Sequence, residues 1–438
     1  MTRPSNIIPI NEAAHVRTQC VLLAVVAVVS FRSIPRILSI LQPAQWIPHF
    51  TSTINWTLRF GLALLQAVEP IEAPWVAIVD ASIDVAVQKV LVVLRVPLSA
   101  LATRGAAITL RDAQCIGISV ADTWNGETVC EYLEQVFART GAPIAIIKDG
   151  GSDLNKGVNL LISAMGVPIK AIEDIGHFAA NALKAEYAKL LKFQNFLSVI
   201  CKAAAKLRQS ELAYLTPPKL RSKGRFQNIG KLAKWAANII PLLGGPGRAR
   251  ANTLAAKLRV FIPGLAQYHV FLNGFSNTCQ VVNSLLELLK NKGFNQTTYG
   301  TAKAILEQLS KNSLVRKRLF EWLDRQLESH AALKIGDLPL LVSSDIIESL
   351  FGKFKLLVAR NPKAEFNRIV LSIVTLCGIT TPEGITSALD QVKQSDLDTW
   401  TKENVKVSQC QLRHAFNQGK LRPDMVPKSG KIIFAESG

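Results

Sequence analysis

The sequence lacks the cysteine pairs that indicate a disulfide framework or a structural zinc site. Its 438 residues include seven cysteines, an odd number, and no two of them form a C-x-x-C pair. Cysteines scattered in this way are typical of a reducing compartment. The six histidines are isolated and no serine lies in a nucleophile-elbow context, so the sequence gives no support to His, Cys or Ser chemistry.

A long hydrophobic run is also missing. The most apolar segment extends from Cys20 to Phe31 and falls short of the roughly 20 apolar residues that a membrane-spanning helix needs. No A-x-A-like cleavage site follows it, and Arg32, Ser33 and Arg36 continue at helical spacing. We therefore predict a buried helix rather than a signal sequence, and no membrane partner.

Acidic residues are scarce in one part of a chain whose formal net charge is +19. Between Phe178 and Ile262, 16 lysines and arginines stand against only Glu186 and Glu211. A charge of this size indicates a polyanionic partner, either nucleic acid or an anionic membrane. A solvated helical face usually mixes signs, so the segment favours a phosphate-binding surface. Trp235 in this segment would either stack on an extruded base or belong to the core.

The hydrophobic pattern changes from helical to strand-like after a linker at residues 69–74. It predicts strands at 75–79, 89–96, 108–120, 144–148 and 167–172, and helices at 127–140 and 154–165. This is the element order of the ribonuclease H-like fold. In that order Asp80 closes the first strand and Asp149 closes the fourth, and these two strands are neighbours at the centre of the sheet.

The first 70 residues predict three helices, the third beginning at Thr51 or Ser52. Its apolar face would be buried, which leaves Asn55 and Arg59 facing away. This layout predicts a helix-turn-helix whose last helix enters a major groove. The connection is longer than the usual tight turn, so a plain three-helix packing module remains an alternative.

No strand pattern occurs between residues 178 and 341, and the next distinctive element is a helix capped near Ser344. Glu348 and Lys355 are seven positions apart and share one face, with Gly352 between them. A neighbouring apolar stripe is expected to bury against the sheet. Gly352 would either let a DNA backbone approach or accommodate a packed neighbour.

Two strand-end aspartates and a helical glutamate are the groups that two-metal phosphoryl transfer needs. The carboxylates of Asp80, Asp149 and Glu348 would hold two Mg2+ ions, with Mn2+ as a substitute. Asp345 is the alternative to the glutamate as third ligand. Asp80 alone could simply cap a turn. Asp84 and Asp153 lie near the two aspartates and are either capping residues or substitute ligands.

These motifs together resemble those of the DDE transposases. The resemblance rests on Asp80 in I-V-D-A-S, Asp149 in I-I-K-D-G-G-S-D, Asp174-I-G-His177, and Glu348 in I-I-E-S-L-F-G-K-F-K. The D-x-x-H element and the helical insertion are similar to those of the hAT and Mutator groups. A zinc finger of the hAT type is missing, so the first 70 residues are more similar to the helix-turn-helix of a bacterial insertion sequence.

The resemblance implies a DNA transposase that cleaves transposon ends by two-metal phosphoryl transfer and joins the 3′-OH to target DNA. Lys355 would contact DNA, and Asp174 and His177 would support the site, although His177 could equally be a structural histidine. The expected partners are terminal inverted repeats, target DNA and further copies of the chain, in the nucleoid of the cytoplasm. The alternatives are a ribonuclease H-like nuclease that only cuts and a domesticated, catalytically silent DNA-binding protein.

The expected fold class is an α/β (α+β) ribonuclease H-like core with a large all-α insertion and an N-terminal all-α domain. Its parts are a helix-turn-helix-like domain at 1–70, the first part of the core at 74–177, a basic insertion at 178–341, the helix of the catalytic glutamate at 342–380, and a helical or loose tail at 381–438. Besides Lys355, the residues expected to bind DNA are Asn55, Arg59, Lys219, Arg221, Lys223 and Arg225.

Overall fold

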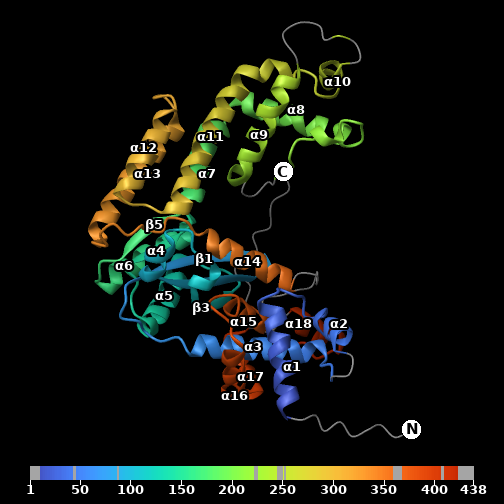
Figure 1. The fold of residues 1–438 in the computed structure, drawn as a ribbon, viewed down its shortest axis with the longest axis vertical. Helices are drawn as coiled ribbons and strands as arrows, with labels where there is room; N and C mark the ends of the chain where they lie inside the picture. Colours follow the sequence, from blue (N-terminus) through green and yellow to red (C-terminus); the bar gives the residue numbers. More distant parts are fainter. Residues whose placement is uncertain are drawn as a thin grey trace. The chain divides into compact units, whose positions relative to one another are not determined.

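The computed structural model of the protein describes residues 10–42, 46–85, 88–220, 225–243, 250, 253–358, 367–405 and 409–422. The chain divides into two compact units (Figure 1). Unit 1 comprises Met1–Ala100, Ile108–Ala171 and Ser344–Gly438, and unit 2 comprises Leu101–Ala107 and Ile172–Ser343. The main part of unit 2 thus coincides closely with the segment in which the sequence predicts no strand.

A five-stranded sheet has the order β3-β2-β1-β4-β5. Its strands are β1 (Trp75–Val85), β2 (Gln88–Pro97), β3 (Gln114–Ala121), β4 (Ala145–Lys148) and β5 (Lys170–Glu173). The first three strands pair antiparallel, whereas β4 is parallel to β1. The prediction that the first and fourth strands are neighbours is confirmed, and the order is compatible with a ribonuclease H-like core.

The first strand is longer than the sequence predicts. Asp80 pairs with Val92 within the β1–β2 ladder, which continues to the pair of Val85 with Gln88. The prediction that Asp80 closes this strand is therefore wrong. β4 ends at Lys148, so beyond this point β1 and β2 continue together as a hairpin.

The segment predicted as one strand at 108–120 is divided in two. A 3-10 helix, η1 (Leu110–Asp112), precedes β3. Thr109 and Asp112 form a capping box that stabilises this turn, with the Thr109 amide donating to Asp112 Oδ2 over 2.8 Å. The polar residues inside the apolar segment therefore begin a helical turn rather than interrupt a strand.

Two helices, α5 (Gly126–Thr140) and α6 (Ser152–Met165), cover one face of the sheet. Their core includes Trp75, Val79 and Ile146 from the strands, and the rings of Trp75 and Phe137 meet edge to face at 5.9 Å. α14 (Asp345–Val358) contacts β1 but contributes no residue to this core. It therefore lies on the other face, as the apolar stripe of its sequence predicts.

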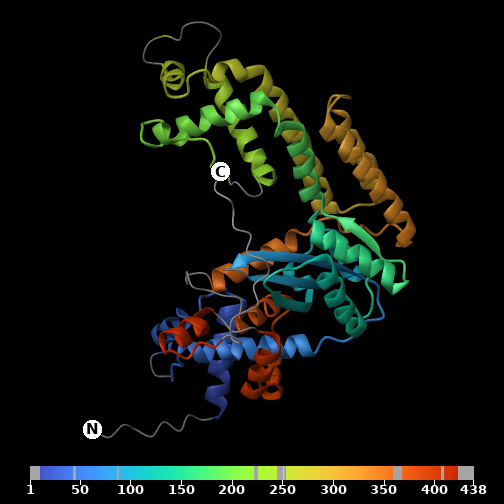
Figure 2. The same ribbon diagram turned by 180° about the vertical axis from the view of Figure 1, so that it is seen from behind.

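The N-terminal and C-terminal helices of unit 1 pack together. α3 contacts α1, α2, α15, α16 and α17, and Figures 1 and 2 show these segments side by side. The bounds are α1 (Ile10–Val25), α2 (Ile34–Leu41), α3 (Phe50–Gln66), η6 (Arg368–Val370), α15 (Leu371–Val374), α16 (Pro382–Gln391), α17 (Gln394–Asn404) and α18 (Gln409–Asn417).

Unit 2 is helical around a core that includes the rings of Tyr187, Phe193 and Phe275. α4 (Leu98–Arg104) spans a boundary between the units. The other helices are α7 (Ile175–Tyr187), α8 (Leu191–Arg208), η2 (Ala213–Leu215), η3 (Arg225–Asn228), α9 (Ile229–Ile239), η4 (Ile240–Leu243), α10 (Leu254–Phe261), η5 (Leu265–Tyr268), α11 (His269–Lys292), α12 (Gln296–Glu307) and α13 (Leu314–Leu333).

The first half of the apolar N-terminal segment lies in a buried helix, as predicted, but α1 ends at Val25 and Val26 beyond it is 57% exposed. The prediction that the helix continues through Phe31 to Arg36 is wrong, because a turn separates α1 from α2. Cys20 and Val21 of α1 are fully buried, and no helix of the described ranges is long and apolar enough to cross a membrane. Cys20 and Cys115 are free thiols. Burial raises the pKa of Cys20 to about 11 and that of Cys115 to about 12, which keeps both thiols protonated and unreactive at neutral pH.

Candidate active site

The strand register brings Asp80 and Asp149 to neighbouring positions. The parallel pairing of β1 with β4 ends at Val79 and Lys148, so the next residue of each segment is an aspartate. Neighbouring strands of a sheet lie about 4.8 Å apart. The two aspartates therefore occupy neighbouring positions where β4 ends.

Asp80 lies on the face of the sheet opposite α5 and α6. Ala77 and Val79 of the same strand belong to the core beneath those helices, and successive side chains of a strand point to opposite faces. The Asp80 side chain is half-buried. It therefore occupies the face that α14 covers, at the edge of the apolar core.

Asp149 follows β4 in a tight loop before α6. Its Oδ1 accepts a hydrogen bond from the Gly151 amide over 3.0 Å, and Gly151 is the N-cap of the helix. Asp149 is half-buried, and no hydrogen bond from a described residue to its Oδ2 is present. One carboxylate oxygen is thus fixed by the loop, and the other is available to a ligand.

α14 presents Glu348 on its exposed side. Asp345 and Gly352 are exposed as well, and their spacing of three and four positions from Glu348 places all three on one stripe of the helix. The opposite side is anchored by the buried side chains of Ile346, Ile347, Leu350, Phe351, Phe354 and Leu357. α14 therefore has one buried face and one face that a large partner can reach.

Gly352 is not required by packing within the described residues. A Cβ at this position would meet no atom of those residues within 4 Å. Lys355, one turn further along, is exposed. Of the two interpretations of the glycine, close approach of a partner therefore agrees better with the structure than contact with a packed neighbour.

The donor atoms at this edge are carboxylate oxygens, which suit Mg2+ and Mn2+. Asp80 and Asp149 fit a pair of ligands, because Mg2+ takes one or two carboxylates and completes its shell with water and phosphate. Within the described part of the chain, however, no three His, Cys, Asp or Glu side chains are grouped so that they could hold a metal ion. The strand register thus places two of the predicted ligands at neighbouring positions, and Glu348 does not complete a group of three with them in the described structure.

The D-x-x-H motif lies in unit 2, where its two ends contact each other. Asp174 is 1% exposed and caps α7, and its Oδ1 accepts a hydrogen bond from the His177 amide over 2.7 Å. The same oxygen lies 3.2 Å from His177 Nδ1. A carboxylate at a helix N-cap satisfies amides that have no partner within the helix. The motif therefore has a structural role at the start of α7.

The predicted DNA-binding face of α3 is occupied by other helices of unit 1. Arg59 donates from Nε to the Val392 carbonyl over 2.7 Å and from Nη2 to the Leu389 carbonyl, both at the end of α16. Asn55 Oδ1 accepts from Arg368 Nη2 over 3.2 Å. The expectation that these side chains face away from the protein is wrong, because helices from the C-terminal part of the chain cover them.

The basic segment is only partly described. Lys219 is exposed, whereas Arg221 and Lys223 lie outside the described residues, as does the side chain of Arg225. Trp235 is half-buried and donates from Nε1 to the Leu215 carbonyl over 2.8 Å. This bond agrees with the interpretation of Trp235 as a packing residue.

The basic character is clearest on α8 and α9. Asn195, Ser198, Lys202 and Lys206 are exposed along one stripe of α8, and that helix contains no acidic residue. α9 has no acidic residue either and exposes two lysines. Amide, hydroxyl and ammonium groups at this spacing form a surface that suits phosphates.

Of the two nearby aspartates that were alternatives, Asp153 lies exposed in the first turn of α6. A carboxylate in the first turn of a helix interacts favourably with the helix dipole. The side chain of Asp84 lies outside the described residues. Asp153 therefore agrees with the interpretation as a helix-start residue.

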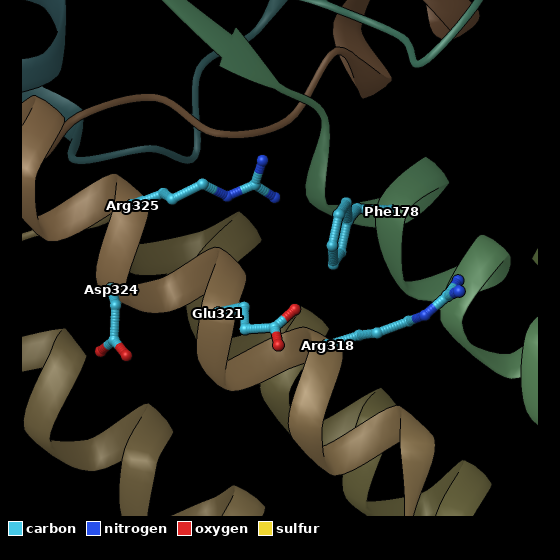
Figure 3. Close-up of a pocket in the computed structure, with 5 residues that line it drawn as sticks. All are labelled: Phe178, Arg318, Glu321, Asp324 and Arg325. Atoms are coloured by element: carbon cyan, nitrogen blue, oxygen red, sulfur yellow. The ribbon is translucent and has the colours of Figure 1, made fainter.

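An open pocket in unit 2 has a volume of about 590 Å3. It is lined by Phe178, Arg318, Glu321, Asp324 and Arg325 (Figure 3). The Arg325 guanidinium lies 5.4 Å from the centre of the Phe178 ring. Asp324 accepts a hydrogen bond over 2.8 Å from a tyrosine of α12. Two basic and two acidic groups share the pocket, so it offers no excess charge of either sign to a ligand.

Sequence reasoning missed Lys148, the residue before Asp149. It is 4% exposed and donates from Nζ to Asn155 Oδ1 of α6. A lysine at the last position of an otherwise apolar strand was the available signal. Its partner lies in the next helix, so the bond could not be read from the strand pattern.

No protein-family model matches the chain, and no curated protein matches it. A solved structure described as the "Drosophila P element transposase strand transfer complex" is similar to this chain. The alignment covers 85% of this chain and 93% of the chain in that structure. The aligned residues are 13% identical, and the TM-score is 0.42. A likeness at this level does not establish a common function.

Proposed function

We propose that this protein is a DNA transposase of the DDE type, which uses Mg2+ to cleave transposon ends and to join the freed 3′-OH to target DNA. The observation that supports this most is the register of β1 and β4, which places Asp80 and Asp149 side by side where β4 ends. Carboxylates at neighbouring strand ends supply the hard oxygen ligands that phosphoryl transfer with Mg2+ requires.

In this proposal Asp80 and Asp149 hold the metal ions. The bound ions would activate the attacking oxygen and stabilise the leaving one. Glu348 completes the ligand set when DNA is bound, from a helix on the same face of the sheet. The reaction then needs no side-chain nucleophile, in agreement with the absence of a Ser or Cys motif in the sequence.

The proposed partners are the terminal inverted repeats of the element and target DNA, bound by a homo-oligomer. Support comes from the exposed Lys202 and Lys206 on the acid-free α8 and from the net charge of the chain. Phosphate contacts by such lysines give affinity without sequence selectivity. The proposed place of action is the nucleoid.

A second candidate function is a DNA-binding protein that does not cleave. One observation favours it: in the described ranges no three potential metal ligands are grouped. In that case the basic helices would still bind DNA, whereas Asp80 and Asp149 would have no partner in catalysis.

An assay with end-labelled DNA that carries the element's terminal repeats tests the proposal. In Mg2+ we expect strand cleavage followed by joining to a second DNA, and loss of both in Asp80→Ala, Asp149→Ala and Glu348→Ala with DNA binding retained. Cleavage without joining would indicate a nuclease. Binding without cleavage by the wild-type protein would support the silent DNA-binding protein.

A further inference from the structure

Lys148 is a buried cation beside the candidate active site. It is the last residue of β4 and 4% exposed. A buried ammonium group costs free energy unless it is paired. Its Nζ donates to Asn155 Oδ1, seven positions further along the chain. The metal-ligand role proposed for Asp149 makes no use of this bond.

The bond joins the end of β4 to the first turn of α6. In that turn the Asn155 amide donates to the Gly151 carbonyl over 2.9 Å. The Gly151 amide in turn donates to Asp149 Oδ1 over 3.0 Å. A continuous path of hydrogen bonds therefore leads from Lys148 through Asn155 and Gly151 to the Asp149 carboxylate.

Glycine at position 151 leaves room for the Asp149 carboxylate; the backbone conformation there does not require glycine. Its φ of −61° and ψ of 136° are open to any residue. A Cβ at this position would lie 3.0 Å from Asp149 Oδ1, which is tighter than ordinary van der Waals contact. A side chain here would therefore move the carboxylate without straining the backbone.

We propose that Lys148 is a positioning residue for Asp149, acting through Asn155 and the first turn of α6. This inference rests on the proposed function, in which Asp149 binds a metal ion. Groups that orient a metal ligand without touching the metal typically contribute about 10- to 100-fold in metal affinity or activity. Lys148 orients the ligand from the α6 side of the sheet, so it needs no access to DNA.

The test compares Asn155→Leu, which removes the acceptor, with Asn155→Asp, which keeps one. Lys148→Met removes the donor, and Lys156→Gln is the matched control on the exposed side of the same helix, where Lys156 pairs with the surface residue Glu127. Mn2+ affinity is measured by electron paramagnetic resonance without DNA. Hydrogen exchange of the Gly151 amide reports directly on the strength of its hydrogen bond to Asp149 Oδ1.

Asn155→Leu and Lys148→Met should each weaken Mn2+ binding about tenfold or more and speed exchange at Gly151. The double variant should be no worse than Lys148→Met alone, because the loss of Lys148 already breaks the bond to Asn155. Asn155→Asp and Lys156→Gln should behave like the wild type. If Lys148→Met does not fold, the two Asn155 variants decide the question.

Faster exchange at Gly151 in Asn155→Leu with unchanged Mn2+ affinity would overturn the inference, since the bond would then serve the fold alone. A wild-type protein that binds no Mn2+ would instead contradict the proposed function. The two failures are thus distinguished by the wild-type titration.

Discussion

α3 and α14 carry similar sequence patterns, yet only one of them presents the predicted face to a partner. Each has an apolar stripe and, beside it, a polar stripe with a basic residue, Arg59 in α3 and Lys355 in α14. The polar stripe of α14 is exposed, whereas that of α3 is bonded to η6 and α16. An apolar stripe identifies one buried face and does not reveal whether the opposite face is covered.

The glycines of the two helices make the same comparison at the level of single atoms. A Cβ at Gly61 of α3 would lie 2.2 Å from the Leu371 carbonyl oxygen, whereas one at Gly352 of α14 would meet no described atom within 4 Å. The backbone of Leu371, from the same protein, therefore occupies the space beside Gly61. The space beside Gly352 is open, so a partner such as DNA could approach the helix there.

The largest expected effect is that of Gly61→Ala. The added methyl group must push α3 away from α15, so we expect the free energy of unfolding to fall by about 3 kcal/mol. Urea denaturation followed by circular dichroism measures the change. A stability equal to that of the wild type would mean that α3 and α15 do not pack as described.

Arg59→Ala should destabilise the protein by about 2 kcal/mol, because two carbonyls at the end of α16 lose a charged donor. Burial lowers the pKa of Arg59, with a further contribution from Arg17, as expected for a group packed among helices. DNA affinity of the folded variant, measured by fluorescence anisotropy, should be unchanged.

The control for Arg59→Ala is Arg36→Ala, which removes an exposed arginine of α2 in the same helical group. It should alter neither stability nor DNA affinity. Lost DNA affinity with unchanged stability in Arg59→Ala alone would reinstate α3 as a recognition helix.

Lys355→Ala should slow DNA cleavage about tenfold, equivalent to about 1.4 kcal/mol of transition-state stabilisation, because a phosphate contact beside the scissile bond is lost. Thermal stability and Mn2+ affinity should stay at wild-type values, since the side chain is exposed. Lys353→Ala, also exposed on α14 but on a different side, is the control. Equal cleavage rates for the two variants would exclude a specific contact at Lys355.

Gly352→Ala has the smallest expected effect and the opposite sign to Gly61→Ala. Alanine is favoured over glycine inside a helix by about 1 kcal/mol, and the site has room for the methyl group. Unfolding in urea should therefore show a gain in stability. A larger side chain in Gly352→Leu should keep the fold but block cleavage, whereas a lower melting temperature would indicate a packed neighbour.

Local pattern was sufficient for the succession of strands and helices and for the apolar runs that precede Asp80 and Asp149. The expectation that these two strands are neighbours came from the ribonuclease H-like fold, with which the observed strand order is compatible. The extent of β1 was missed because its second half, beyond the pairs with β4, alternates polar residues such as Ser82 and Asp84 with apolar ones. The sequence analysis relied on the continuous apolar run from Trp75 to Val79 and so ended the strand too early.

The rest of the structure depends on contacts between distant parts of the sequence. The approach of Leu371 to Gly61 and the bonds of Arg59 to α16 join segments more than 300 positions apart, and no periodicity encodes them. The position of Glu348 relative to Asp80 and Asp149 also depends on how distant segments pack. The helix of Glu348 and its exposed face were predictable from the sequence, whereas the distance of Glu348 from the two strands was not.

The central claim, that Asp149 holds a metal ion for strand cleavage, is tested most directly by Asp149→Cys assayed in Mg2+ and in Mn2+. Carboxylates suit Mg2+, whereas a thiolate prefers softer ions. We therefore expect cleavage of labelled DNA to be lost in Mg2+ and partly restored in Mn2+. Asp153→Cys, on the exposed first turn of α6, should cleave in both. Wild-type cleavage by Asp149→Cys in Mg2+ would contradict the claim.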